Sequence, residues 1–491
     1  MLLGVVSSMS KTLNGKRRVD KVTDPENQAL DSTRAISLDG RGFQFTGQVE
    51  GVVELGSFVT LRGTDGVIHL GQVDDVALTI EGTFRAAGRV LGTISTDGRL
   101  DARRSTPFAA AKVEDADATA IALLYGGTDV TLAIGSYLAS DGIPARLLPG
   151  RFNRHTFWCG QSGSGKTYAL GVVLEQILVH TGMPMVIFDP NADFVRLREF
   201  ASGTEHSDAA RAISSREIRI LRPSLPDPNS LRVRFIDLSM QAKGAVLRLD
   251  PLVDRAEYNE LVHLEQTVGT LAADHIVPKL LERGTSAAHA LAARIENLRV
   301  TEWGVWAGGF TAVTDILETR PDATVLDLGG FTYPDESLVV ALAVLDDLWS
   351  KREQRRPILI VIDEAHNLCS PETSSPLQVA VRERLIQIAA EGRKFGLWLL
   401  LSTQRPSRIH PSIISQCDNL ALMKMTSPLD LDELATIFGF VPAAMLARSP
   451  GFRQGEALFA GGFVPAPTIV TMGRRVTREG GADVSVPLRR A

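Results

Sequence analysis

Two short segments of the chain carry residues whose types and spacing suit phosphate chemistry. The first is Gly160-Gln161-Ser162-Gly163-Ser164-Gly165-Lys166-Thr167, which fits the P-loop pattern GxxxxGK(S/T). In such a loop the backbone N–H groups surround phosphate oxygens, the lysine reaches the β- and γ-phosphates, and the threonine hydroxyl ligates Mg²⁺. Glycine-rich loops also occur by chance, but here a strand pattern (Thr156–Cys159) precedes the loop and a helical pattern (Tyr168–His180) follows it. We therefore predict that the loop binds ATP and that Thr167 is a ligand of Mg²⁺.

The second segment is an apolar run, Ile358–Ile362, that ends in two carboxylates, Asp363 and Glu364. A continuous apolar run is typical of a parallel strand covered on both faces, and open α/β sheets bind their ligands at the carboxyl ends of such strands. We therefore expect both carboxylates to lie beside the P-loop. Asp363 is then the second predicted metal residue, holding Mg²⁺ through water, and Glu364 is the general base that polarises the attacking water. The alternative is a pair of solvated loop carboxylates, which a P-loop in the same chain disfavours.

The tetrapeptide Asp363-Glu364-Ala365-His366 also spells the DEAH box of a helicase family. Those helicases carry two RecA-like cores and a later arginine-rich glycine motif. After Leu401 this chain reads Ser402-Thr403-Gln404-Arg405-Pro406, and no second core follows. We interpret the match as coincidental beyond the shared Walker B chemistry.

The motifs lie in a region, from His155 to about Gly439, where strand and helix patterns alternate. That alternation predicts the α/β class, with a mostly parallel sheet covered by helices on both faces, as in a RecA-like P-loop NTPase. The stretch Met240–Leu317 lacks strand patterns, which indicates a helical insertion. The expected strands are Thr156–Cys159, Met185–Asp189, Thr324–Leu328, Ile358–Ile362, Leu397–Ser402 and Leu420–Met425, with further strand character over Ala457–Met472.

An earlier region, Phe43–Gly98, contains short β-type runs separated by glycines, which predicts a small antiparallel β-barrel. A nucleic-acid-binding barrel uses exposed aromatic side chains for stacking, and few aromatics are present here, so we favour a structural or assembly role. Ala109–Leu124 has a helical pattern. The expected division of the chain is a tail (1–38), the barrel (39–110), the first part of the ATPase domain (111–239), the helical insertion (240–320), the second part of the ATPase domain (321–475) and a C-terminal tail (476–491).

The composition excludes several classes of protein. With 52 basic and 57 acidic side chains the net charge is −5, so a strongly basic nucleic-acid coat is excluded for the chain as a whole, although a local basic channel is not. Cys159, Cys369 and Cys417 lie far apart, which disfavours a disulfide framework and a zinc site and fits a reducing cytoplasm. The sequence has no apolar run of the roughly 18–20 residues that a membrane span needs.

Several segments resemble motifs of one known family. Arg154-His155 directly precede the P-loop strand, Glu391–Gly396 and Ser402–Pro406 flank a later strand, and Pro411–Asp418 reads PSIISQCD. These segments closely match the HerA family of hexameric DNA-translocating ATPases, within the larger HerA/FtsK group. The resemblance extends from about residue 40 to 475, and the early region resembles the HAS-barrel that caps HerA rings.

One further segment follows the family pattern with departures. Asp189-Pro190-Asn191-Ala192-Asp193-Phe194 looks like the family's D-x-H-G-E-(Y/F) segment, but it has Asn for His, Ala for Gly and Asp for Glu.

The resemblance implies roles for three more residues. Gln404 is expected to contact the γ-phosphate or the water. Arg393 matches an arginine that enters the neighbouring subunit's site as a finger in trans, although it would also suit a helix end as a cation that complements the dipole. Arg154 is expected to be a second nucleotide-sensing arginine, with a surface salt bridge as the alternative. The predicted catalytic residues are Glu364, Lys166, Gln404, Arg393 and Arg154.

The resulting functional prediction is an ATP-driven, ring-forming translocase or helicase for double-stranded DNA, with six copies around a central pore. The resemblance implies cooperation with a NurA-like nuclease, or with a sirtuin-like or other effector in anti-phage defence, and no membrane partner. Two alternatives stay open: a secretion- or conjugation-type ATPase, and an ATP-gated scaffold that assembles a partner enzyme without translocating.

Overall fold

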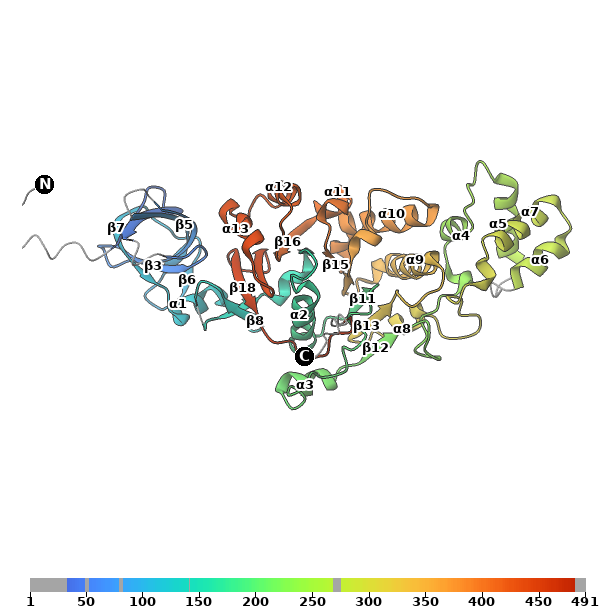
Figure 1. Ribbon diagram of the computed structural model, residues 1–491, viewed down its shortest axis with the longest axis horizontal. Helices are drawn as coiled ribbons and strands as arrows, with labels where there is room; N and C mark the ends of the chain where they lie inside the picture. The colour runs from blue at the N-terminus through green and yellow to red at the C-terminus, as the bar shows by residue number, and fades with distance from the viewer. Residues whose placement is uncertain (1–32, 49–52, 79–82, 141, 268–274, 482–491) are drawn as a thin grey trace, which may run out of the picture.

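The computed structural model describes residues 33–48, 53–78, 83–140, 142–267 and 275–481. Residues 1–32 of the predicted N-terminal tail and residues 482–491 of the predicted C-terminal tail lie outside the described part of the chain. Figure 1 shows the predicted order of parts along an elongated molecule, with the barrel at one end, the sheet in the middle and helices α5, α6 and α7 at the other end.

The barrel is a ring of six antiparallel strands. Strands β2, β1, β7, β3, β4 and β5 pair in that order, and β5 pairs back with β2, while β6 adds to the outer side of β5. Its core contains Phe43, Phe45 and Phe84, so these aromatic side chains are buried rather than available for stacking on bases. The strands are β1 (Arg34–Ser37), β2 (Gly42–Gln48), β3 (Phe58–Arg62), β4 (Ile68–Leu78), β5 (Thr83–Ile94), β6 (Leu100–Asp101) and β7 (Phe108–Asp115).

Two sequence predictions about this region are wrong. Strand β1 lies inside the segment predicted as a tail. The segment Ala109–Leu124, predicted as a helix, begins as strand β7, and helical structure is confined to α1 (Ala118–Ala122) and the short helix η3 (Leu123–Tyr125). An alanine-rich segment favours a helix locally, but β7 pairs with both β1 and β3 and thereby closes the ring. Tertiary pairing therefore overrides the local propensity.

The predicted ATPase domain is built on one sheet of eleven strands, in the order β12-β13-β11-β14-β15-β10-β16-β17-β18-β8-β9. The strands from β12 to β16 in this order are parallel, and the remaining pairings are antiparallel. The strands are β8 (Leu132–Tyr137), β9 (Pro144–Leu147), β10 (His155–Cys159), β11 (Met185–Asp189), β12 (Ile218–Leu221), β13 (Ala323–Asp327), β14 (Ile358–Ile362), β15 (Leu397–Thr403), β16 (Cys417–Leu422), β17 (Glu456–Gly461) and β18 (Thr468–Met472).

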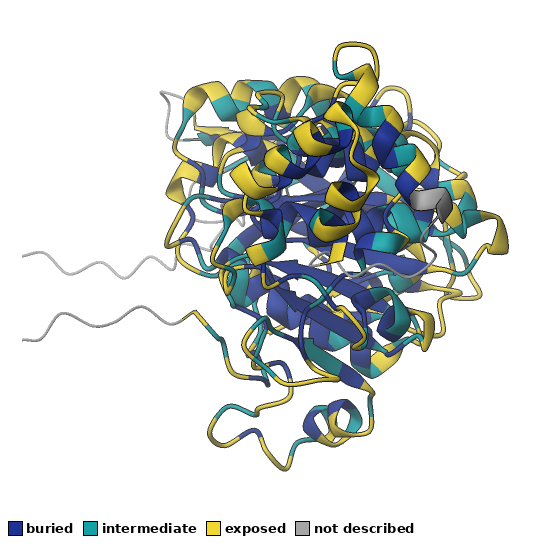
Figure 2. Ribbon diagram, turned by 90° about the vertical axis from the view of Figure 1, so that its right-hand side faces the viewer, coloured by how far each residue is buried: buried dark blue, intermediate teal, exposed yellow. Residues whose placement is uncertain are grey.

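Helices cover both faces of this sheet, as the sequence predicts. Phe157 of β10 packs in the core formed with α9 and α10, whereas its neighbour Trp158 packs in the core formed with α2. Figure 2 shows the buried strands inside the domain and the exposed outer sides of the helices. These helices are α2 (Lys166–His180), α3 (Asp208–Ser214), α9 (Pro334–Ser350), α10 (Pro376–Glu391), α11 (Pro411–Ile414), α12 (Pro428–Ile437) and α13 (Ala443–Ala447).

The expected strands are present, with ends that differ by up to three residues. Strand β12 is absent from the prediction because it is a four-residue strand at the edge of the sheet. The described part of the predicted insertion contains helices and no named strand. Its helices are α4 (Met240–Val246), α5 (Arg255–Thr267), α6 (Ile276–Arg283), α7 (Ser286–Asn297) and α8 (Val313–Glu318).

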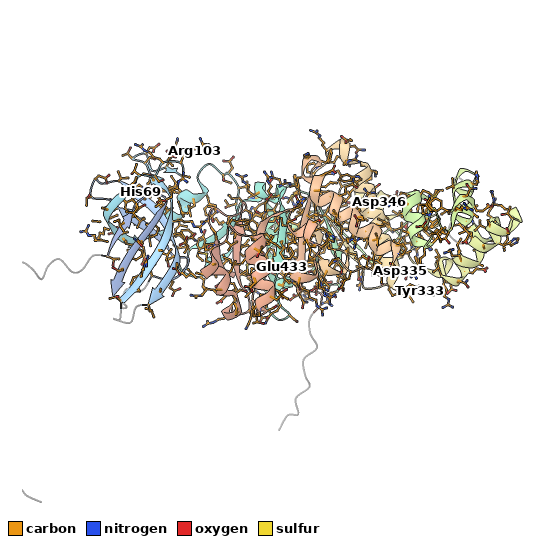
Figure 3. The ribbon with its side chains drawn as sticks, turned by 90° about the horizontal axis from the view of Figure 1, so that it is seen from above. His69, Arg103, Tyr333, Asp335, Asp346 and Glu433 are labelled. Atoms are coloured by element: carbon orange, nitrogen blue, oxygen red, sulfur yellow. The ribbon has the colours of Figure 1, made fainter. Side chains whose placement is uncertain are left out.

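Residues on either side of α4, at the start of the insertion, contact two aspartates of helix α9 that Figure 3 labels. Ser239 donates a hydrogen bond to Asp346 at 3.1 Å, and Arg248 forms an ion pair with Asp335 at 3.2 Å. Among the described residues, no helix has the length and apolar character needed to cross a membrane.

The prediction of a C-terminal tail from residue 476 is also wrong for its described part. The backbone N–H groups of Val476 and Thr477 donate to the carboxylate of Glu175 on α2, at 2.8 and 2.6 Å. Arg475, whose side chain is only 1% exposed, lies 3.8 Å from the same carboxylate. Residues 475–477 are therefore part of the packed domain, held against the helix that follows the P-loop.

Candidate active site

The P-loop runs between the carboxyl end of β10 and the first turn of α2. Gly163 (φ +76°) and Gly165 (φ +87°) adopt left-handed backbone conformations, which glycine accepts without strain. A Cβ atom on Gly160 would lie 2.7 Å from the Cβ of Met423, so this glycine lets the loop pass close to the residue that follows β16. Helix α2 has no side-chain cap at its N-terminus. Its first N–H groups are therefore available to a phosphate.

Lys166 of the P-loop is buried against the carboxylates of the second predicted motif. Its ammonium group donates to Asp363 Oδ1 at 2.9 Å and to Ser402 Oγ at 2.8 Å, and lies 3.4 Å from Glu364 Oε1. Burial by itself lowers the pKa of Lys166, but the charges of Asp363 and Glu364 outweigh burial and raise this pKa. Lys166 is therefore a permanent cation at the point where the strands end.

The residues of the site fit ATP and Mg²⁺. Asp363 Oδ2 and Ser164 Oγ are buried and have no hydrogen-bond partner among the described residues. Carboxylate and hydroxyl oxygens are the donors that Mg²⁺ prefers. Asp363 and Thr167 are thus suited to hold the ion, and Ser164 offers a hydroxyl to a phosphate oxygen.

Glu364, two residues after the end of β14, has an unusual backbone conformation with φ +43° and ψ +50°. Gln404 donates from its side-chain amide to Glu364 Oε1 at 2.7 Å, so the structure brings these two predicted residues together. Burial alone raises the pKa of Glu364, but the hydrogen bond with His366, the charge of Lys166 and the Gln404 amide lower this pKa to about 2. The carboxylate is therefore ionised.

His366 is a site residue that our sequence reasoning missed. It lies in the short helix η9 (Ala365–Asn367), with its Nδ1 3.2 Å from Glu364 Oε2 and 3.1 Å from Thr403 Oγ1. The signal in the sequence is the DEAH spelling, which our interpretation treats as coincidental beyond its carboxylates. Ser402 is a second missed residue, because its hydroxyl donates to Asp363 Oδ1 at 2.7 Å while it accepts from Lys166.

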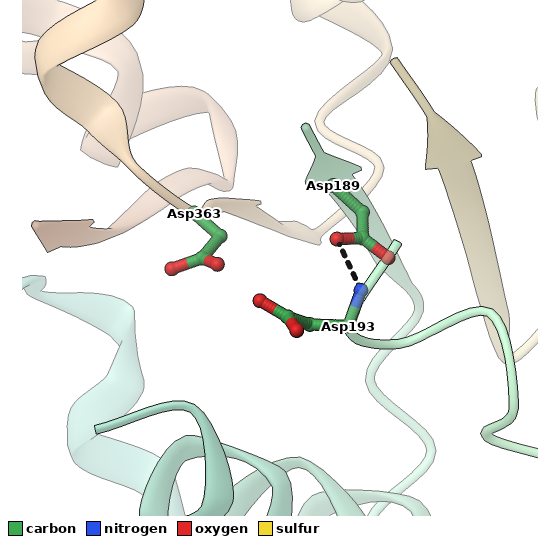
Figure 4. Close-up of side chains that lie close together, drawn as sticks. All are labelled: Asp189, Asp193 and Asp363. Carbon is green, nitrogen blue, oxygen red and sulfur yellow. Dashed lines mark hydrogen bonds between the residues drawn. The ribbon is translucent and has the colours of Figure 1, made fainter. Parts of the chain in front are cut away.

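Two further aspartates face Asp363, as Figure 4 shows. Carboxylate oxygens of Asp189, Asp193 and Asp363 lie within 4.8 Å of one another. Asp189 accepts the backbone N–H groups of Asp193 and Phe194, at 2.9 and 2.8 Å, and so fixes the loop after β11. Burial is the main reason that the pKa is raised to about 7 for Asp189 and to about 6 for Asp193.

The two predicted arginines lie elsewhere. Arg154 precedes β10, and Arg393 belongs to the short helix η10 (Gly392–Phe395) that precedes β15. Both are therefore at the amino ends of strands whose carboxyl ends carry the P-loop and Gln404. Arg393 donates to Asp418 at 2.6 Å, and Arg154 lies 3.7 Å from the same carboxylate oxygen.

His155, next to Arg154, is fully buried. Its Nδ1 accepts the backbone N–H of Leu399 at 2.9 Å, and its Nε2 is 3.0 Å from the carbonyl oxygen of Ala389. Burial lowers the pKa of His155 to about 4, with the charges of Arg393 and Arg154 acting in the same direction. A neutral imidazole thus joins the starts of β10 and β15 to the end of α10.

Comparison with known proteins agrees with this geometry. The family model described as the central domain of helicase HerA matches residues 132–345, which include the P-loop and the acidic loop after β11. The DNA double-strand break repair helicase HerA of Pyrococcus furiosus is 21% identical over 87% of this chain and 89% of its own length. Residues 132–345 therefore form a HerA-type central domain. The chain is an ATP-hydrolysing enzyme.

Two further relatives and one solved structure also match. Probable helicase MJ1565 of Methanocaldococcus jannaschii is 22% identical over 96% of this chain and 92% of the relative. The HerA helicase of Sulfolobus acidocaldarius is 24% identical over 82% and 80%. Among solved structures, the genome packaging NTPase B204 of Sulfolobus turreted icosahedral virus 2 with AMPPCP matches 65% of this chain and 97% of its own, at 13% identity and a TM-score of 0.29.

Proposed function

We propose that this ATPase assembles into a six-membered ring and couples ATP hydrolysis to the translocation of double-stranded DNA. The observation that carries the ring is the position of Arg393. At about 3.3 Å per residue, the seven residues of β15 separate Arg393 from Gln404 by about 23 Å. Arg393 is therefore out of reach of its own P-loop, and an arginine finger at this position serves the site of a neighbouring subunit.

In this proposal each active site combines residues of two chains. One chain contributes Lys166, Asp363, Glu364 and Gln404, and the next contributes Arg393 and Arg154. The arginines stabilise the negative charge that develops on the γ-phosphoryl oxygens. Thr167 and Asp363 would hold Mg²⁺, which would further neutralise the phosphate charge.

The ion-paired position of Lys166 suggests how ATP prepares Glu364. When phosphate oxygens accept hydrogen bonds from Lys166, the ammonium group leaves Asp363 and Glu364. Glu364 then loses one of the groups that lower its pKa, and it becomes a stronger base for the attacking water. Gln404 and His366 continue to orient the carboxylate.

DNA as the translocated substrate is supported by the relatives, several of which are named DNA double-strand break repair helicases. A motor that grips the phosphate backbone needs no base-specific side chains. The proposed setting is the cytoplasm, and the proposed partner is a NurA-like nuclease or a sirtuin-like or other defence effector that receives or protects the translocated DNA.

The proposed function is tested by three measurements on the full-length chain. Sedimentation is expected to show hexamers, ATP turnover is expected to rise with double-stranded DNA, and a strand-displacement assay is expected to depend on ATP. Hexamers whose ATP turnover does not change with DNA, and which displace no strand, would contradict the translocase. That result would favour the ATP-gated scaffold. Monomers with full ATPase activity would contradict the ring.

A further inference from the structure

The amino ends of three adjacent strands, β15, β10 and β16, carry a cluster of charged side chains that the proposed chemistry uses only in part. Arg393 lies before β15, Arg154 before β10, and Asp418 is the second residue of β16. We name these three residues the arginine clamp. Arg393 Nη1 donates to Asp418 Oδ2 at 2.6 Å, and Arg154 Nη1 lies 3.7 Å from that same oxygen. A single carboxylate oxygen of Asp418 thus interacts with both guanidinium groups.

The backbone beneath the clamp is fixed by buried polar side chains next to two of its members. His155 follows Arg154 and is tied to α10 and β15 by its two ring nitrogens. Asn419 follows Asp418, is fully buried, and donates to Thr156 Oγ1 and to the carbonyl oxygen of Arg151, at 3.2 Å each. An isolated surface ion pair usually contributes little because both of its side chains are free to move. Here the attachment points of Arg154 and Asp418 are held by hydrogen bonds inside the domain.

The side chains themselves stay open to an incoming anion. Their exposed fractions are 33% for Arg393, 45% for Arg154 and 49% for Asp418. Two cations and one anion leave the clamp with a net positive charge, and guanidinium groups bind phosphate oxygens through paired N–H donors. Without Asp418 the two arginines would repel each other and separate.

We propose that Asp418 is a positioning residue of the shared active site: it holds Arg393 and Arg154 together so that both guanidinium groups reach the γ-phosphate bound by the neighbouring subunit. This inference rests on the proposed ring with arginines acting in trans. During each cycle a phosphate oxygen of the neighbour's ATP replaces the carboxylate as the acceptor of Arg393. After hydrolysis, Asp418 again forms ion pairs with both arginines.

The test compares Asp418→Ala, Asp418→Asn and Asp418→Glu in the full-length protein with saturating DNA. We expect Asp418→Ala to lower kcat with little change in KM for ATP, because the arginines act on the transition state. The loss should be on the order of 10–100-fold, as for other groups that orient a functional side chain, and smaller than the roughly 10³-fold loss of an arginine finger. Asp418→Asn, which keeps the shape without the charge, should lie between Asp418→Ala and the unchanged protein, and Asp418→Glu should restore part of the rate.

A matched control is Glu383→Ala, since Glu383 also forms an exposed ion pair, with Arg382 on α10 at 2.8 Å. This variant should keep the full rate. Sedimentation and thermal unfolding of each variant show whether the ring and the fold persist. If Asp418→Ala does not fold, the isosteric Asp418→Asn variant tests the proposal instead. An unchanged kcat for ATP hydrolysis in the folded variant would overturn the proposal.

Mixed rings separate a positioning role from a merely structural one. Asp418→Ala chains mixed with Glu364→Gln chains should recover activity, because an intact Glu364 site then meets an intact clamp from its neighbour. If Arg393→Ala chains recover activity in the same mixture but Asp418→Ala chains do not, the inference on Asp418 is overturned while the shared site stands. If Arg393→Ala alone is fully active, or recovers nothing on mixing, the shared site fails and the Asp418 proposal fails with it.

Discussion

The two ends of the parallel strands differ sharply in how they hold their charges. At the carboxyl ends, Lys166 and Asp363 are almost fully buried and paired with each other, and burial and pairing shift the pKa values of most neighbouring groups. At the amino ends, Arg393 and Arg154 are partly exposed and share a single acceptor on Asp418. The first arrangement suits a preorganised catalytic centre, and the second suits groups that must meet something outside their own chain. In the proposed ring, one chain would therefore contribute two half-sites rather than one complete site.

The largest expected effect is at the exposed end. Arg393→Ala should lower the rate of ATP hydrolysis by about 10³–10⁵-fold, because the charge on the γ-phosphoryl oxygens loses its partner from the next subunit. Steady-state ATPase assays measure this directly. Lys394→Ala is the matched control, since Lys394 is an exposed cation in the same turn. Comparable ATPase activity in the Arg393→Ala and Lys394→Ala variants would mean that Arg393 is only a cation at a helix end.

At the buried end, Glu364→Gln should retain ATP binding and lower turnover by about 10²–10⁴-fold, the usual contribution of a general base. Binding depends on the P-loop and is measured by titration with a fluorescent ATP analogue, while turnover is measured by phosphate release. Glu372→Gln serves as the control, because Glu372 is a largely exposed carboxylate. Near-normal hydrolysis by the Glu364 variant would remove this residue from the mechanism.

Removing residues 1–116, which contain the described barrel strands, should disrupt the ring. Arg393 then no longer meets a neighbouring site, while the affinity of the P-loop for ATP changes little. Exposed apolar side chains on the barrel, including Leu38 and Leu78, are suited to contacts between subunits. Sedimentation measures the ring and nucleotide titration measures the P-loop, with a variant lacking only residues 1–32 as the control. Intact hexamers of the shorter chain would contradict an assembly role for the barrel.

A smaller effect is expected at Ser402, which joins Lys166 to Asp363. Ser402→Ala removes a buried hydroxyl that is hydrogen-bonded to two charged groups, each such bond contributing about 1.5–3 kcal/mol. We expect kcat to fall by about tenfold with the ring intact, measured beside Ser407→Ala, whose side chain is exposed. An unchanged kcat would mean that Lys166 and Asp363 hold their positions without this link.

Local sequence patterns were sufficient to predict which residues lie together in the candidate active site. The P-loop glycines, the apolar run before Asp363 and the alternation of strand and helix are short-range features, and the rule that parallel strands end at one edge brings Lys166, Asp363 and Glu364 together. The pairing of Gln404 with Glu364 follows from the same rule, because β14 and β15 are adjacent.

Other features were decided by tertiary structure alone. Strand β7 forms from a segment with helical propensity because it closes the barrel, and residues 475–477 pack on α2 because Glu175 accepts their N–H groups. Likewise, Asp418 meets Arg393 and Arg154 only because β15, β10 and β16 are neighbours in the sheet, although β10 is far from the other two along the chain. The physical reason is that propensity and periodicity act over a few residues, whereas strand order and the partners of buried charges depend on contacts between distant segments.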